Sequence, residues 1–265
     1  MYKTAGIQIN YDYISEEDFE KKFKIGNYLA PLTIALFANS PFNENKLSGF
    51  LSYRGKVWQE TNRGGIMPIT FENINFEKYI DHAINYPILF LKKNEKYYSP
   101  NGQTFRDFLN GNLSFLKGEK PTLEDFENHL GTIFTEIRLK QVIEFRSLDT
   151  CNFGCICNGP SFFTGLIYGS LDETYEIIKN WKKEEVMDAY LNAPKQGLNT
   201  LLKNKKLIDW AKIFLDISKK GLDKRNELNK SGKNETIYLK HIEEIIKNKK
   251  TRAEILIEQY NKTNN

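Results

Sequence analysis

The sequence predicts an α+β protein, with antiparallel strands in its first two thirds and helices in its last third. Residues 3–12 alternate between apolar and polar side chains, as expected of a strand with one buried face. Residues 138–149 place polar side chains at alternate positions among apolar and β-branched ones, which indicates a second strand. From Ser170 onward the pattern is helical almost throughout. We therefore expect a sheet-containing portion over 1–169 and a helical portion over 170–265, packed as one continuous domain.

The first strand and the helix after it follow from local patterns. Gln8 and Asn10 lie on the polar face of the strand, which either faces solvent or lines a site. The sequence from Ser15 to Asp18 is of the capping-box type, and a helical apolar stripe follows it. Pro31 interrupts this stripe, so we expect the helix to kink or break there.

The sequence predicts loops in the middle of the chain and helices towards its end. Residues 39–70 are dense in Gly, Pro, Asn and Ser and predict long loops with short strands. Ordered loops of this length are usually functional. Helix starts are expected at Thr122, Ser170 and Thr251, each with an acidic residue three positions later. A buried stripe is expected on one late helix, formed by Leu207, Trp210, Phe214 and Ile217.

The composition is that of an ordinary globular protein. Hydrophobic residues make up 40% and charged residues 27%, and 38 basic against 34 acidic side chains give a net charge of +4. This small excess does not indicate nucleic-acid binding, and lysines at 203–206 and 247–250 fit solvated helix faces. The sequence shows no membrane-spanning apolar run and no export signal, so we expect a cytoplasmic protein. Neither a P-loop nor a Rossmann glycine motif is present.

Three cysteines, Cys151, Cys155 and Cys157, lie in one short loop-like stretch. A structural zinc site needs four ligands with paired spacing, and no histidine lies nearby in the sequence. The metal interpretation is therefore weak, and we expect reduced thiols.

The stretch from Arg138 to Asp149 holds the most informative pattern. Side chains two apart on a strand share a face, so Arg138, Lys140, Glu144 and Arg146 are expected to line up together. Such a row costs desolvation free energy unless a ligand uses it. Mg²⁺ with a polyphosphate would do so, because the carboxylate can bind the metal ion and the arginines the phosphoryl oxygens. The alternative is a solvated ion-pair lattice.

Several blocks around this row closely resemble the plant and proteobacterial branch of the glutamate–cysteine ligases. The key block reads Glu-Asn-His-Leu-Gly-Thr-Ile-Phe-Thr-Glu-Ile-Arg-Leu-Lys and is followed by Glu-Phe-Arg-Ser-Leu-Asp. The blocks keep the family's order, and the similarity runs from about Tyr2 to Tyr260. Blocks in register are a far stronger signal than any one motif. They occupy residues 37–42, 49–54 with Trp58, 102–108, 127–140 and 144–149.

The resemblance implies a fold and a reaction. The family folds like glutamine synthetase, as a funnel of curved antiparallel strands with helices packed outside it. Its members use ATP to join the side-chain carboxylate of L-glutamate to the amine of L-cysteine through an acyl phosphate. The product is γ-glutamylcysteine, in the first step of glutathione biosynthesis. Mg²⁺ and fixed cations are expected to neutralise charge on the triphosphate.

The resemblance also assigns roles to the row of charges. Glu144 matches the metal-binding glutamate of the family's Glu-x-Arg motif and is expected to bind Mg²⁺. Arg146 matches the arginine of that motif and is expected to hold the transferring phosphoryl group. Arg138 is expected to be a second catalytic cation. For Arg138 and Lys140, charge balance beside Glu144 is an equal alternative.

A second set of residues is expected to bind the substrates. Arg54 and Trp58 lie in the block that contacts glutamate in the family, where an arginine can hold the α-carboxylate bidentately and the tryptophan packs as a lid or core residue. Asn39 and Ser40 would either bond substrate or end the preceding helix. Arg63 resembles an arginine in a family loop that is longer in plants. The residues expected to line the ATP side of the site are Gln8 and Asn10.

Two other residues receive different interpretations. His129 lies in a capped helix and is interpreted as structural, since an amine nucleophile needs no dedicated base. Cys157 falls where the family often has a cysteine, and some members use a cysteine near this position in a redox disulfide.

The resembling family carries a large N-terminal portion before the strand that matches residues 3–12, with several acidic metal ligands. One glutamate cannot hold several Mg²⁺ ions. We therefore expect a partial ligase with little activity alone, which needs that portion or a partner chain. The alternatives are a non-catalytic or partner-dependent relative, a ligase for another amine acceptor, or a structural helical protein associated with nucleic acid.

Overall fold

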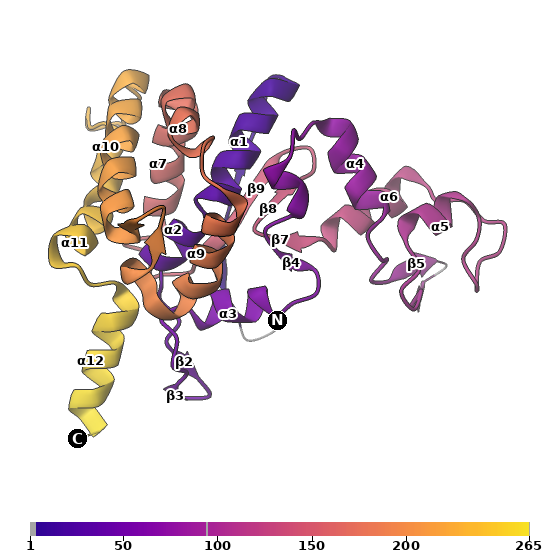
Figure 1. Ribbon diagram of the computed structural model, residues 1–265, viewed down its shortest axis with the longest axis horizontal. Helices are drawn as coiled ribbons and strands as arrows, with labels where there is room; N and C mark the ends of the chain where they lie inside the picture. Colours follow the sequence, from indigo (N-terminus) through magenta and orange to yellow (C-terminus); the bar gives the residue numbers. More distant parts are fainter. Residues whose placement is uncertain (1–3, 94, 265) are drawn as a thin grey trace.

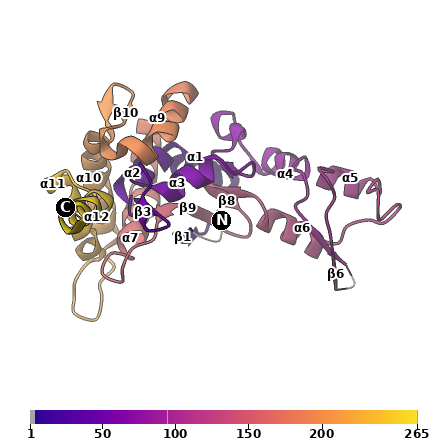
Figure 2. The ribbon, with the colours of Figure 1, turned by 90° about the horizontal axis from the view of Figure 1, so that it is seen from below.

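The computed structural model describes residues 4–93 and 95–264. Figures 1 and 2 show a main body, in which helices surround a small sheet, and an arm that projects from one side. The long helices of the C-terminal third lie at the end opposite the arm. The predicted α+β class is confirmed.

The central sheet has three antiparallel strands in the order β1 (Gly6–Tyr11), β9 (Ile143–Asp149), β8 (Ile137–Leu139). The single strand expected over 138–149 is therefore wrong, because the chain turns back at residues 140–142 and forms a β-hairpin. Alternation does not distinguish one long strand from two short ones joined by a turn, since both arrangements keep the polar side chains on one face.

One face of this sheet is apolar and packs on α1 (Glu16–Tyr28). Ile9, Phe145 and Ile137 are partners across the three strands, and all are buried. Gly26 of α1 sits directly on this face, where an added Cβ would lie 2.5 Å from Ile137 Cδ1. Close approach of helix and sheet therefore requires glycine at this position.

The predicted helix after β1 and its break are confirmed. The Ser15 side chain accepts a hydrogen bond from the backbone N–H of Asp18 and caps α1. A second helix, α2 (Ala30–Leu36), begins with Pro31 in its first turn, where the missing N–H has no consequence. Both helices contribute to the main core.

The segment predicted to be loops contains one helix that the pattern missed. Short strands β2 (Phe42–Asn43), β3 (Lys46–Leu47) and β4 (Gly64–Gly65) are present, and a 3₁₀ turn covers Pro68–Phe71. Between them lies α3 (Tyr53–Gln59), whose capping residue Ser52 accepts from the N–H of Gly55. At seven residues, α3 is too short to show a helical periodicity.

The arm has a small core of its own. Its buried residues include Leu91, Phe105 and Phe108. The expected helix start at Thr122 is confirmed by a capping box, and His129 is structural as interpreted: it is buried, and its Nε2 lies 2.8 Å from the carbonyl oxygen of Ala83. The elements of the arm are α4 (Phe76–Ile84), β5 (Leu91–Lys93), β6 (Lys96–Tyr98), α5 (Phe105–Leu109) and α6 (Leu123–Gly131).

Helices form most of the C-terminal third, as predicted. The capping box at Thr251 is present, whereas Ser170 starts its helix without a side-chain cap, because its hydroxyl points to the carbonyl of Ile217 at 3.4 Å. The helical interpretation of the lysines at 203–206 is wrong, because these residues belong to a β-hairpin: Lys203 lies in its turn, and Lys205 and Lys206 form its second strand. Between the arm and this portion come β7 (Phe134–Thr135), α7 (Asn158–Thr164) and a π-helical turn (Gly165–Gly169). The elements of the C-terminal third are α8 (Leu171–Ile178), α9 (Lys183–Gln196), a 3₁₀ turn (Gly197–Asn199), β10 (Leu201–Leu202), β11 (Lys205–Lys206), α10 (Leu207–Arg225), a further 3₁₀ turn (Glu235–Leu239), α11 (Lys240–Asn248) and α12 (Arg252–Asn264).

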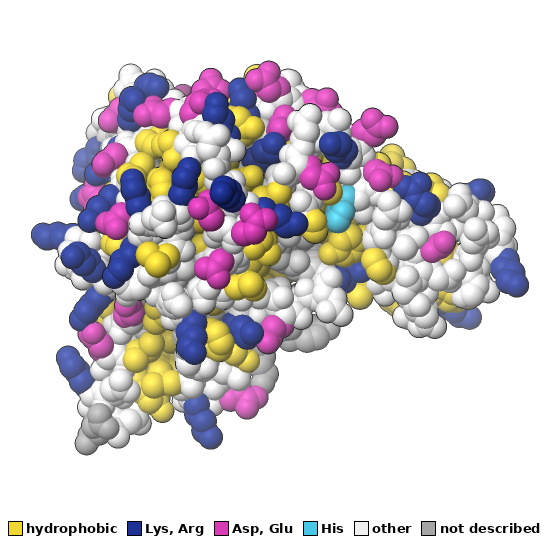
Figure 3. All heavy atoms as spheres, viewed as in Figure 1, with side chains coloured by type: hydrophobic (Ala, Val, Ile, Leu, Met, Phe, Trp, Pro, Cys, Tyr) yellow, Lys and Arg dark blue, Asp and Glu magenta, His cyan; other side chains and the backbone are white. Residues whose placement is uncertain are grey.

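The main core joins sheet and helices. The expected stripe of α10 is buried, and it belongs to the same cluster as the apolar sheet face. The boundary expected at residue 169 stays a prediction. On the face seen in Figure 3, acidic and basic side chains are interspersed. Within the described ranges we find no helix with the length and apolar character that crossing a membrane requires.

Candidate active site

The polar face of the sheet carries a buried ion-pair network. Asn10, Glu144 and Arg138 are partners across β1, β9 and β8, so their side chains share a face. Nε and Nη2 of Arg138 lie 2.6 and 2.5 Å from Oε2 of Glu144, and Nη1 of Arg146 lies 3.4 Å from the same oxygen. Only 8% of Glu144 is exposed, so this network is not a solvated lattice.

All three guanidinium nitrogens of Arg138 have partners. Besides Glu144, it donates through Nη1 to the carbonyls of Gly131 at 2.6 Å and Ile133 at 3.1 Å. Lys140 is half-exposed and lies 3.7 Å from the other oxygen of Glu144. This geometry favours the charge-balancing alternative for Arg138 and Lys140, and the catalytic role of Arg138 stays a prediction.

A β-bulge brings another carboxylate to the polar face. A register shift in the β1–β9 pairing leaves Arg146 and Ser147 together opposite Gln8. The extra residue reverses the alternation for the rest of β9, so Asp149 returns to the face that carries Arg146. Strict alternation from Arg146 would have placed Asp149 on the apolar face.

Asp149 anchors the loop that follows α2. Its Oδ2 accepts from the backbone N–H of Asn39 at 2.9 Å and from the Ser40 hydroxyl at 2.7 Å, and its Oδ1 accepts from the Ser52 hydroxyl at 2.8 Å. Burial raises the pKa of Asp149, and the nearby Arg54 cation partly counters this. Asn39 and Ser40 thus serve this carboxylate, and their predicted contact with substrate stays a prediction.

Helix α3 places Arg54 and Trp58 beside Arg146. The guanidinium carbons of Arg54 and Arg146 each lie 5.3 Å from the centre of the Trp58 ring, within cation–π range. Nη2 of Arg54 also donates to the carbonyl of Arg146. A Cβ on Gly6 would lie 2.5 Å from Nε of Arg54, so glycine in β1 leaves room for the guanidinium. Three residues predicted from the sequence are thus brought together.

Four buried polar atoms in this group have no hydrogen-bond partner in the described part of the chain: Nη1 of Arg54, Nε1 of Trp58, Nε of Arg146 and Oε2 of Glu136. Buried polar atoms are nearly always bonded, so each exception calls for an explanation, such as a ligand. Burial also lowers the pKa of Arg146 to about 10, with repulsion from Arg138 as the next cause. Three of the four unpartnered atoms are N–H donors, which an anionic ligand could satisfy, and the fourth is a carboxylate oxygen.

The structure does not bring the remaining candidates into this group. Arg63 donates through Nε to the carbonyl of Thr132 and through Nη2 to its hydroxyl, both at 2.8 Å, and through Nη1 to Pro87 at 2.5 Å. It thus ties β4 to the base of the arm, and its role with substrate stays a prediction. Gln8 and Asn10 are exposed on the polar face of β1, as the alternation predicted.

Sequence reasoning missed Glu136, Tyr190, Ser52 and Asp149. The Tyr190 hydroxyl donates to Oε1 of buried Glu136 at 2.7 Å. Glu136 stands two residues before Arg138, and this spacing is the signal that could have revealed it. Tyr190 comes from α9, and no local pattern connects the two.

The residues described here offer little to a metal ion. Within 4–93 and 95–264, no three His, Cys, Asp or Glu side chains gather as potential ligands. Oε2 of Glu144 is bound by Arg138, whereas among the described residues the contact given for Oε1 is the 3.7 Å one with Lys140. Glu144 can therefore supply one carboxylate oxygen to Mg²⁺, with the other ligands coming from elsewhere.

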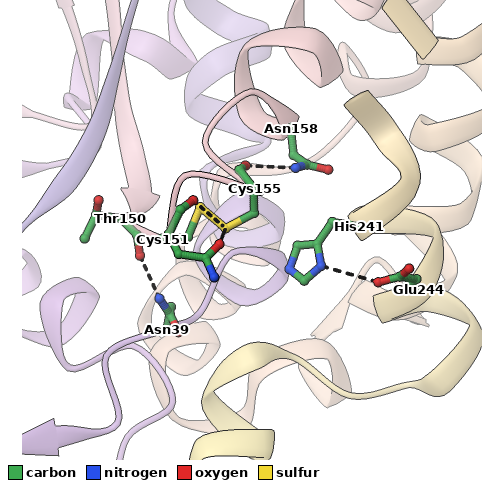
Figure 4. Close-up of a disulfide and its surroundings, with 8 residues drawn as sticks. Asn39, Thr150, Cys151, Cys155, Asn158, His241 and Glu244 are labelled. Carbon is green, nitrogen blue, oxygen red and sulfur yellow. Dashed lines mark hydrogen bonds and ion pairs between the residues drawn. A yellow bond between two sulfur atoms is a disulfide. The ribbon is translucent and has the colours of Figure 1, made fainter. Parts of the chain in front are cut away.

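The expectation of reduced thiols is wrong for two of the three cysteines. Cys151 and Cys155 form a disulfide directly after β9, and Cys157 is free and exposed. In Figure 4 this disulfide lies between the side chains of His241 and Asn39. The Asn39 side chain donates a hydrogen bond to the carbonyl oxygen of Thr150. Two cysteines four residues apart can be bridged by a disulfide across a short loop. The sequence interpretation weighed a zinc site against reduced thiols and did not include this pairing.

Fold and site together define an α+β protein with a buried, arginine-rich polar face, which suits anionic ligands. Comparison with known proteins is more specific: residues 1–264 match glutamate-cysteine ligase family 2, and the chain belongs to this family.

Curated relatives from plants agree. Over 265 residues, the chain is 40% identical to the chloroplastic glutamate–cysteine ligase of Solanum lycopersicum, covering 98% of this chain and 50% of the relative. Identity is 38% to chloroplastic ligase B of Oryza sativa subsp. japonica and 38% to the chloroplastic ligase of Arabidopsis thaliana, with 98% of this chain and 52% and 50% of those relatives covered. The chain spans about half the length of the curated relatives it matches.

Proposed function

We propose that this chain forms the part of a glutamate–cysteine ligase that holds anionic groups of the substrates between Arg54 and Arg146. The observation that carries the proposal is the cluster of unpartnered donors around Trp58, which a carboxylate or phosphoryl group would satisfy. Membership of the family supplies the reaction to which this binding belongs.

The proposed reaction has two steps. The terminal phosphoryl group of ATP passes to the side-chain carboxylate of L-glutamate, giving an acyl phosphate and ADP. The amine of L-cysteine then attacks the acyl carbon, loses a proton and expels phosphate, which leaves γ-glutamylcysteine. In this scheme Arg54 binds the α-carboxylate of glutamate, and Arg146 holds the phosphoryl oxygens.

Mg²⁺ would neutralise charge on the triphosphate, and Glu144 is proposed to contribute one oxygen ligand. Glu144 also has a second task, because its Oε2 fixes Arg138 and faces Arg146. Arg138 therefore orients Glu144 rather than touching substrate in this proposal.

The larger architecture is also a proposal. The three-stranded sheet would form part of the funnel expected from the resemblance to glutamine synthetase. The chain spans about half of its relatives' length. We therefore propose that this chain binds glutamate and that ligation takes place in the assembled funnel. A cytoplasmic location stays a prediction, and the named relatives are described as chloroplastic.

Calorimetric titration of the purified chain with L-glutamate tests this function. We expect saturable binding that Arg54→Ala abolishes. Arg106→Ala is the matched control, because Arg106 pairs with Asp81 in the arm. Equal affinity in wild type and Arg54→Ala, or no binding by the wild type, would overturn the proposal.

A further inference from the structure

Asp149 is a buried carboxylate at the end of β9 that holds two serine hydroxyls. The residue is 2% exposed. Its Oδ1 accepts the Ser52 hydroxyl at 2.8 Å, and its Oδ2 accepts the Ser40 hydroxyl at 2.7 Å. A hydroxyl has one proton to donate, and both serines give theirs to this carboxylate. The lone pairs of both hydroxyl oxygens are thereby left to accept hydrogen bonds from other groups.

The two hydroxyls in turn bond the first turn of α3. The Ser40 oxygen accepts from the backbone N–H of Arg54, and the Ser52 oxygen accepts from that of Gly55, both at 3.0 Å. Amides in the first turn of a helix have no partner within the helix, so these hydroxyls satisfy them. A Cβ on Gly55 would lie 3.0 Å from the Ser52 oxygen, so glycine at this position leaves room for the hydroxyl.

Strand β9 thus holds Arg54 at two points. At one end of the residue, Nη2 donates to the carbonyl of Arg146. At the other end, the backbone N–H is held by Ser40, whose hydroxyl is fixed by Asp149, three residues after Arg146 in the same strand. Between these points the Arg54 guanidinium carbon lies 5.3 Å from the centre of the Trp58 ring. The position of α3 on β9 therefore determines where this guanidinium lies.

A serine can cap a helix without a buried charge behind it. Ser15 caps α1 at an exposed position, where water can accept its proton. Ser52 is fully buried, and burying the carboxylate beside it is unfavourable unless that charge is well bonded. Hydrogen bonds to a charged acceptor are shorter and stronger than those between neutral groups. Asp149 therefore fixes the direction of hydroxyls that capping alone would leave free to turn.

We propose that Asp149 is a positioning residue that fixes the start of α3 through the two serine hydroxyls. Because α3 carries Arg54, the carboxylate thereby sets where the Arg54 guanidinium lies beside Trp58. Its effect on the affinity for the substrate carboxylate rests on the proposed function. The position of α3 does not depend on that function.

NMR of the full chain tests the proposal through the change Asp149→Asn, which keeps the shape of the side chain. The Asn39 N–H requires an acceptor on its side, so the new N–H₂ group should face Ser52 and turn its hydroxyl. We expect the Gly55 backbone amide to exchange with solvent roughly tenfold faster, the effect of losing one hydrogen bond. The Nε–H signal of Arg54 should shift, and L-glutamate binding should weaken by roughly tenfold.

Two further variants complete the design. Ser40→Ala combined with Ser52→Ala removes both hydroxyls and leaves the carboxylate in place, so it should also shift the Arg54 signal. Ser48→Ala is the matched serine control, because this hydroxyl donates to the carbonyl of Pro41 at 2.8 Å. The control should leave the Arg54 signal and L-glutamate affinity unchanged.

The outcomes separate positioning from the proposed function. An unchanged Arg54 signal in Asp149→Asn, with only a lower melting temperature, would overturn the positioning role and make Asp149 structural. A shifted signal in a chain whose wild type binds no L-glutamate would support positioning and refute the proposed function. Should Asp149→Asn not fold, the double serine variant decides by the Arg54 signal in the same way.

Discussion

Arg138 and Glu144 face each other across the β8–β9 hairpin, joined by two contacts of 2.6 and 2.5 Å to a single carboxylate oxygen. Both side chains are buried, where an unpaired charge is strongly unfavourable. Each side chain therefore neutralises the charge of the other. The pair fixes the geometry of the hairpin and directs the other oxygen of Glu144 towards Lys140.

Arg138→Ala should destabilise the chain by about 3–5 kcal/mol, because it leaves a buried carboxylate without its cation. Urea unfolding followed by circular dichroism measures this loss. Lys140→Ala is the control: its ammonium is half-exposed and 3.7 Å from Glu144, so it should cost less than about 1 kcal/mol. Similar losses in both variants would show that the pair is not the main stabilising contact.

Stability should depend on pH through Glu136 and Asp149. Burial raises the pKa of both carboxyls above their ordinary values of 4.5 and 3.8. Their contribution is therefore fully present below those values and is lost as pH rises through the raised, folded-state values. Glu136→Gln should remove part of this dependence, by up to about 1.4 kcal/mol per pH unit. Parallel curves of unfolding free energy against pH for variant and wild type would contradict the prediction.

Reduction of the Cys151–Cys155 disulfide should lower the free energy of unfolding by about 2 kcal/mol, because it closes a loop of only a few residues. Thermal unfolding with and without dithiothreitol measures the change, and Cys151→Ser should abolish the response. Cys157→Ser should keep it, since this thiol is free. A response that follows Cys157 instead would show a different pairing.

Arg146→Lys should weaken binding of a non-hydrolysable ATP analogue by about tenfold or more, although the charge is retained, because Arg146 is proposed to hold the phosphoryl oxygens. Arginine offers a planar fork of donors and stacks on Trp58, whereas lysine presents a point charge. Calorimetry at two ionic strengths checks the effect, because a role in charge alone would leave lysine nearly equivalent at low salt. Full affinity in the lysine variant would remove the bidentate role.

Local patterns predicted much of the fold. Side-chain alternation gave the buried and exposed faces of β1, and capping sequences gave the starts at Ser15, Thr122 and Thr251. The hairpin at residues 140–142 and the short helix α3 escaped prediction, because neither changes the periodicity over enough residues to be recognised.

For the site, motif residues in one segment were recognisable and tertiary partners were not. Glu144 and Arg146 were predicted from the pattern of one strand, and Arg54 and Trp58 from one sequence block. Tyr190 lies 54 residues beyond Glu136, and Asp149 reaches the polar face only through a bulge. Such contacts depend on packing and register, which a linear pattern does not contain.

The most direct test of the account is a crystal structure of the chain grown with L-glutamate. We expect the ligand carboxylate to contact Nη1 of Arg54, at about 3 Å, within the group formed with Trp58 and Arg146. Glutamate bound elsewhere, or no glutamate at saturating concentration, would contradict the claim that this polar sheet face is the substrate site.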